Sequence, residues 1–82
     1  MTVAQYYYDN VIAPFYTLAN NGDVSPQGIS FYEKAVFACA RLNEQAGLPG
    51  KALSYLRRLV EYGTPERAQA EREIARIENG KE

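Results

Sequence analysis

The segment Gly47-Leu48-Pro49-Gly50 separates two long stretches of periodic apolar residues and is only long enough for a tight turn between helices. Glycine ends helices because it adopts the left-handed backbone conformation, and proline is favoured in the first position of the next helix. The segment therefore predicts an antiparallel helical hairpin. Its first helix ends near Ala46, and its second helix begins at Pro49.

The N-terminal half contains two further helical segments. The first is predicted from Val3 to about Asn20, and Pro14 should kink it or divide it at Ala13-Pro14, because proline removes a backbone donor. The helix that leads into the hairpin has two competing starts. Ser25-Pro26 offers an N-cap followed by proline, whereas Ser30 and Glu33 have the spacing of a capping box.

The C-terminal half also contains residues that end one helix and start another. Gly63 should end the helix that begins at Pro49, and Thr64-Pro65-Glu66 should start a fourth helix with the Thr64 hydroxyl as its N-cap. This helix should run to about Glu78, and Arg67 with Glu71 could pair one turn apart on it.

Apolar spacing predicts which faces of the helices form the core. The six consecutive apolar residues from Ala35 to Ala40 surround most of the circumference of their helix. This helix should therefore be covered on several sides and be the central element. The other predicted core positions, in chain order, are Tyr8, Val11, Ile12, Phe15, Leu18, Ala19, Ala52, Leu53, Leu56, Leu59 and Val60. The last helix should cover an edge of the core with one narrow face, and its few apolar residues are Ala68, Ala70, Ile74, Ala75 and Ile77. Eighty-two residues suffice for one core. We therefore predict an all-α fold, a small four-helix bundle of antiparallel helical hairpins forming a single domain over residues 1–82.

Composition narrows the possible functions. Nine basic and ten acidic residues leave a net charge of -1, which argues against a strongly basic surface for nucleic acid or membrane. The absence of histidine excludes Ser–His and Cys–His nucleophiles, and the carboxylates of the last helix alternate with arginines as on a solvated face. Cys39 lies in the apolar run and should be a buried, unreactive thiol. We expect no catalytic residues, no cofactor and no metal site, and a cytoplasmic protein without a leader or a membrane span.

Residues 36–65 resemble one tetratricopeptide unit. The residues that carry this resemblance are Ala40 at the small position of the first helix, Gly47 at the turn, Ala52, Leu53 and Leu56 in the second helix, and Pro65 after it. The resemblance implies a closely packed antiparallel hairpin. It also implies that Lys34, Phe37, Arg41 and Glu44 occupy the positions that line the concave groove of that family. The family's carboxylate clamp is not reproduced, so no peptide C-terminus is implied as a ligand.

Residues 42–56 also resemble a helix-turn-helix, with Gly47 in the turn and Leu53 and Leu56 as apolar positions of the recognition helix. The resemblance implies a second set of candidate residues, which would contact DNA. Lys51, Arg57 and Arg58 would face phosphates, and Ser54 and Tyr55 would approach bases.

Surface recognition is the function that the sequence favours. Phe37 falls within the polar strip of Lys34, Arg41 and Glu44, so it either packs beneath the first or fourth helix or anchors a partner. Tyr6 should be exposed, because three consecutive tyrosines cannot all face one core, and tyrosine is enriched at interfaces. We therefore predict a small non-enzymatic protein-protein interaction module, adaptor or inhibitor-like, which could also be a homodimer. The alternative is a helix-turn-helix DNA-binding regulator.

Overall fold

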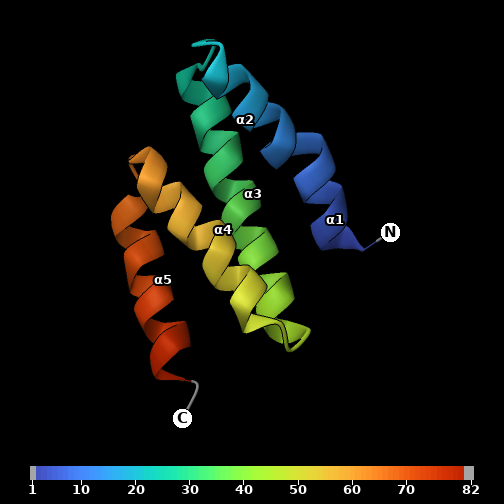
Figure 1. Cartoon of the computed structure of the whole chain (residues 1–82), viewed down its shortest axis with the longest axis vertical. Helices are drawn as coiled ribbons and strands as arrows, with labels where there is room; N and C mark the ends of the chain where they lie inside the picture. Colours follow the sequence, from blue (N-terminus) through green and yellow to red (C-terminus); the bar gives the residue numbers. More distant parts are fainter. Residues whose placement is uncertain (1, 81–82) are drawn as a thin grey trace.

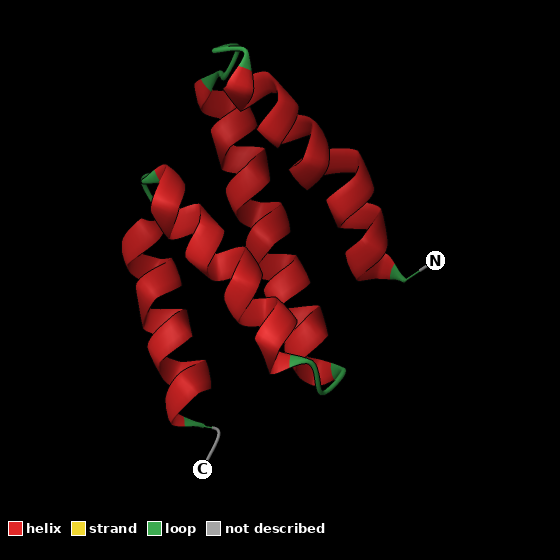
Figure 2. Cartoon of the chain, viewed as in Figure 1, coloured by secondary structure: helices red, strands yellow, loops and turns green. Residues whose placement is uncertain are grey.

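The computed structural model describes residues 2–80, and within that range it contains helices and turns but no strand (Figure 2). The elements are α1 (Val3–Tyr7), a π-helical turn η1 (Tyr8–Ile12), α2 (Ala13–Asn20), α3 (Pro26–Gln45), α4 (Pro49–Tyr62) and α5 (Arg67–Asn79). The predicted all-α class is confirmed, and so is the count of four helical segments when α1, η1 and α2 are taken as one bent rod.

The helices stand side by side in chain order, and each runs antiparallel to the one before it (Figure 1). The N-terminal rod packs on α3, α3 packs on α4, and α4 packs on α5. The central position predicted for α3 is therefore confirmed. The N-terminal rod and α5 lie at opposite edges, and the Cα atoms extend over 41 × 30 × 16 Å.

The N-terminal rod divides next to Pro14, as predicted, but its buried face differs from the predicted one. The Ala13 N–H bonds to the carbonyl of Tyr8, five residues back, which makes η1 a π turn. A π turn takes up one more residue than an α turn and so rotates the preceding residues around the helix axis. Tyr8 is consequently exposed instead of buried, and Tyr7 packs partly against the core.

The other incorrect core position in this rod is Leu18, which is exposed. Ala19 is the neighbour that packs against the core, and consecutive residues are about 100° apart on a helix. Leu18 therefore lies on the solvent side of the rod. Ile12 and Phe15 are buried as predicted.

The ends of α3 follow local signals. The Ser25 hydroxyl accepts a hydrogen bond from the Gly28 N–H at 3.0 Å, so the earlier of the two competing starts is the one used. At the other end Gly47 adopts φ 78°, and the Leu48 N–H donates to the Asn43 carbonyl at 2.8 Å. These bonds close the helix in a Schellman arrangement. The predicted hairpin turn is confirmed.

The start of α5 differs from the prediction. The helix begins at Arg67, and the Thr64 hydroxyl, although buried, has no hydrogen-bond partner among residues 2–80 and does not cap it. The Glu33 carboxylate on α3 accepts a hydrogen bond from the Glu66 N–H at 2.7 Å instead. A carboxylate is favourable at the positive end of a helix, so a residue from another element stabilises this terminus.

The predicted pair between Arg67 and Glu71 does not form within the described residues. The ion pair between α4 and α5 joins Arg57 to Glu78 at 3.1 Å. The Arg57 side chain is 55% exposed and the Glu78 side chain 50%, so the pair contributes little to stability.

One core joins all the helices. The buried apolar side chains form a single cluster of Ile12, Phe15, Tyr32, Ala35, Val36, Cys39, Ala40, Ala52, Leu53, Leu56, Leu59, Ala70 and Ile77. Cys39 donates its thiol hydrogen to the Ala4 carbonyl at 3.2 Å, and burial raises the pKa of this thiol to about 11. The prediction of a buried thiol is confirmed, and at neutral pH it remains protonated and a poor nucleophile.

Candidate functional site

The polar strip predicted on α3 is a continuous stripe in the structure. Lys34 and Arg41 are exposed, whereas Phe37 and Glu44 are half-buried. All four residues line hollows on one face of α3, and Phe37 contributes to three of these hollows. The structure therefore brings together the four α3 residues that the sequence singled out for partner binding.

The first hollow, here called the α5 cleft, lies between α3 and α5 above α4 and has a volume of about 110 Å³. Its base includes the buried side chains of Ala40, Leu56 and Ile77. The remaining lining residues are Phe37, Arg41, Glu44, Gln69, Glu73 and Arg76. The cleft thus combines an apolar base with a charged rim.

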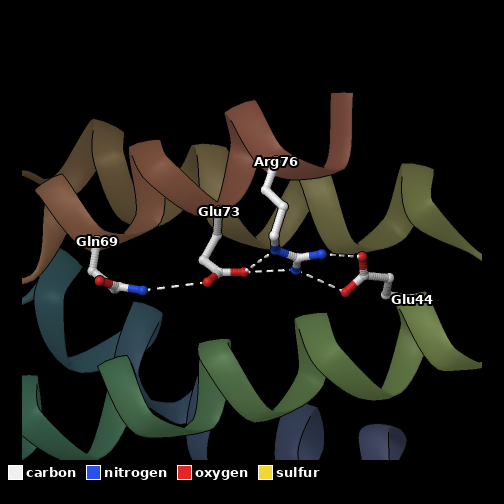
Figure 3. A network of polar contacts seen from close by, with 4 residues as sticks. All are labelled: Glu44, Gln69, Glu73 and Arg76. Carbon is white, nitrogen blue, oxygen red and sulfur yellow. Dashed lines mark hydrogen bonds and ion pairs between the residues drawn. The ribbon is translucent and has the colours of Figure 1, made fainter. Parts of the chain in front are cut away.

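Figure 3 shows that a network of polar contacts bridges this rim from α5 to α3. Arg76 donates two hydrogen bonds to the Glu44 carboxylate, at 2.7 and 2.9 Å, and its guanidinium also bonds to Glu73 at 2.7 Å. Gln69 donates to Glu73 at 3.3 Å. Both oxygens of Glu44 are bound to Arg76, so this pair links α5 to α3, while the packing of α5 on α4 holds the helix in place.

The Glu44 carboxyl should titrate at lower pH than an ordinary glutamate. Hydrogen bonds from Arg76 favour its ionised form and lower its pKa. The stabilisation from this pair is therefore present above the ordinary glutamate pKa, about 4.3, and is lost as the pH falls through the lowered value. Carboxyl-detected NMR titration should show the low pKa, and Arg76→Ala should raise it toward the ordinary range, while the nearby Arg41 charge continues to lower it. An unchanged Glu44 titration in that variant would contradict the pairing.

The second hollow, here called the α1 cleft, lies between α1 and α3 and has a volume of about 440 Å³. It is lined by Val3 and Tyr7 of α1 and by Phe37, Ala38, Arg41 and Leu42 of α3. Arg41 is the one charged residue in this lining. Among residues 2–80 it forms no ion pair. The α1 cleft is therefore an open, mainly apolar hollow with a single cation.

A third hollow, of about 430 Å³, continues the stripe toward the start of α3 and α5. Its lining includes Lys34 and Phe37 together with Glu33, Glu66 and Gln69. Lys34 therefore lies beside carboxylates. Arg41 lies between two surroundings, because it lines the apolar α1 cleft and also the α5 cleft with Glu44 and Glu73.

Tyr6 is exposed, as predicted, but it lines none of these three hollows. Its ring contacts the edge of Tyr7, with centroids 6.3 Å apart. Tyr6 is thus separate from the stripe on α3, although its neighbour Tyr7 belongs to the α1 cleft.

The residues proposed for DNA contact do not form one free basic face. Arg57 pairs with Glu78 on α5, and the Arg58 guanidinium lies over the Tyr16 ring, 4.2 Å from its centroid. Lys51 and Ser54 are exposed, and Tyr55 is half-buried beside Tyr8. The preceding helix α3 is continuous over 20 residues, whereas a helix-turn-helix begins with a short helix.

Sequence reasoning missed the residues that other helices contribute to the site. Val3 and Tyr7 complete the α1 cleft, and Gln69, Glu73 and Arg76 form the rim of the α5 cleft. The alternation of glutamate and arginine on α5 was visible but is typical of solvated helices, so it carried no signal for a cleft.

Two further observations bear on the kind of site. Residues 2–80 contain no group of three or more cysteine or acidic side chains placed to hold a metal ion. Across that same range, every helix is too short or too polar to cross a bilayer.

Comparisons of this chain with protein-family models, with curated proteins and with solved structures found no match.

Proposed function

We propose that this chain is a small non-enzymatic protein-binding module, adaptor or inhibitor-like, and that its partner occupies the face of α3 between α1 and α5. The observation that carries the proposal is the position of Phe37, half-buried at the junction of three hollows. Binding energy at protein interfaces is concentrated in central aromatic and arginine side chains surrounded by a polar rim. Phe37 and Arg41 are such a pair.

The arrangement of the helices supports the same face. The N-terminal rod and α5 stand at opposite edges of the molecule with α3 between them, so side chains from both edges reach the stripe on α3 (Figure 1). The packing of α5 on α4 and the Arg76 network keep the rim of the cleft formed without a partner, and a preformed surface loses less entropy on binding. The resemblance of residues 36–65 to a tetratricopeptide unit favours this face as well.

Phe37→Ala should weaken binding of the natural partner. The chain would be used to capture proteins from its native host, and a captured protein would be identified, purified and titrated calorimetrically. Loss of a central aromatic anchor should raise Kd by at least about fivefold, or about 1 kcal/mol. Circular dichroism should show the helical signal unchanged.

Phe31→Ala is the matched control, since Phe31 is on the same helix, is 66% exposed and lines none of the three hollows. Its Kd should match that of the original chain. An equal loss in both variants would refute the assigned face, and unfolding by Phe37→Ala would make Phe37 a core residue. Binding of duplex DNA at physiological salt, abolished by replacing Arg57 and Arg58 with alanine, would favour the DNA-binding alternative.

A further inference from the structure

The charges around the stripe on α3 are unequally paired. Around the α5 cleft, the Arg76 guanidinium is neutralised by Glu44 and Glu73. Arg41 lines the same cleft but, within the described chain, has no partner in an ion pair. Arg41 attracts the Glu44 carboxylate without direct contact, so among residues 2–80 its guanidinium stays free of ion pairs where the α5 cleft and the α1 cleft meet.

The other side chains of the α1 cleft are apolar or aromatic. Val3 is exposed, whereas Tyr7, Phe37, Ala38 and Leu42 are half-buried. Apolar side chains of a partner would remove this surface from water, and a charge pair in a partly apolar cleft is less screened than one in bulk water. The cleft is thus complementary to a ligand that combines apolar side chains with a carboxylate.

The spacing of these residues indicates the form of the ligand. Val3 and Tyr7 are one turn apart on α1, and Phe37 and Arg41 are one turn apart on α3. Positions four residues apart on a helix are about 6 Å apart, so a helix lying in the cleft would present side chains at the same interval. Amphipathic helices commonly bind in apolar grooves in this way.

We propose that the α1 cleft binds an acidic amphipathic helix of a partner protein, with apolar side chains against Val3, Tyr7 and Phe37 and a glutamate or aspartate paired with Arg41. The inference rests on the proposed function and adds the chemistry of the partner. The guanidinium accommodates a carboxylate through two parallel hydrogen bonds, which selects an acidic helix over a basic one.

Two synthetic peptides test the charge preference. Both are helices of about 18 residues with the same leucine stripe, a length at which isolated helices form, and their other positions carry glutamate in one and lysine in the other. Fluorescence anisotropy should show binding of the glutamate peptide to the full chain and at least about tenfold weaker binding of the lysine peptide. Arg41→Glu should reverse this order of affinities. Arg41→Gln should lower the affinity for the glutamate peptide without raising the affinity for the lysine peptide.

Lys51→Glu is the control for nonspecific attraction, because it makes the same charge change on the exposed surface of α4, outside the α1 cleft. It should leave the affinity for the glutamate peptide unchanged. Equal weakening by Lys51→Glu, or equal binding of the two peptides, would overturn the inference. So would concentration-dependent dimerisation of the chain that Arg41→Glu abolishes, since the occupant would then be a second copy.

The outcome also separates this inference from the proposed function. If Phe37→Ala weakens binding of the natural partner but Arg41→Glu does not, the module binds proteins through Phe37, and the proposal that the ligand is an acidic helix is wrong. If a natural partner binds Phe37→Ala and the original chain equally well, the face on α3 that the proposed function assigns to the partner is wrong, whatever the peptides show.

Discussion

Replacing Leu56 with alanine should lower the free energy of unfolding by about 2 to 5 kcal/mol. Leu56 is 1% exposed and lies at the base of the α5 cleft with Ala40 of α3 and Ile77 of α5. The small neighbour Ala40 cannot fill the space that the removed atoms leave. The free energy of unfolding of a domain this small is only about 5 kcal/mol. We therefore expect urea denaturation to show a strongly destabilised or unfolded chain.

Leu18→Ala removes the same atoms from a side chain that is 48% exposed and serves as the control. Its unfolding free energy should change by no more than about 0.5 kcal/mol, as for ordinary surface substitutions. The comparison also tests the correction at Leu18, which the helical periodicity alone had placed in the core. Equal costs at the two positions would show that burial on α2 or α4 is wrongly assigned.

Tyr32→Ala should destabilise the chain by about 3 to 5 kcal/mol, as expected for loss of a large buried aromatic ring. Tyr32 is fully buried, and its ring stacks on Phe15 of α2 at a centroid distance of 4.0 Å. It also contacts the rings of Tyr16 and Tyr62, at 5.6 and 6.0 Å. The ring therefore joins α2, α3 and α4, and its loss should weaken the attachment of the N-terminal rod.

Tyr32→Phe separates the contribution of the ring from that of the hydroxyl. The Tyr32 hydroxyl lies 3.1 Å from the Tyr16 hydroxyl, and burial raises the pKa of Tyr32, so the group stays protonated. Its removal should cost only about 0.5 to 1.5 kcal/mol, because half-buried Tyr16 can bond to water instead. Chemical denaturation followed by circular dichroism measures both variants. Equal costs would mean that the hydroxyl contact, and not ring packing, holds α2 in place.

The all-α class and most helix ends could be predicted from the sequence because their causes are local. The Ser25 hydroxyl caps an N–H three residues away, and Gly47 closes α3 through its own backbone conformation. Such interactions act within one turn of the chain and are therefore visible as short motifs. The stripe of Lys34, Phe37, Arg41 and Glu44 follows in the same way from the helical period.

Local sequence patterns were insufficient where the same residues could adopt two different local structures. Pro14 indicated a break in the N-terminal rod, but the π turn that accommodates it decided that Tyr7, and not Tyr8, faces the core. Thr64 had the pattern of an N-cap, yet the cap is the Glu33 carboxylate. A buried acceptor that packing brings to a helix terminus replaces the local cap, and sequence spacing does not reveal it.

The sequence by itself therefore determined the helices and most of their outward side chains, Tyr8 and Leu18 excepted, whereas the tertiary structure decided which of those side chains share a cleft. Glu44 and Arg76 are 32 residues apart in the chain, and their contact exists only because α3 and α5 both pack on α4. The same holds for Val3 and Tyr7 beside Phe37. Helical periodicity specifies the face on which a residue lies, but the element opposite that face depends on how the apolar stripes of distant helices are buried together.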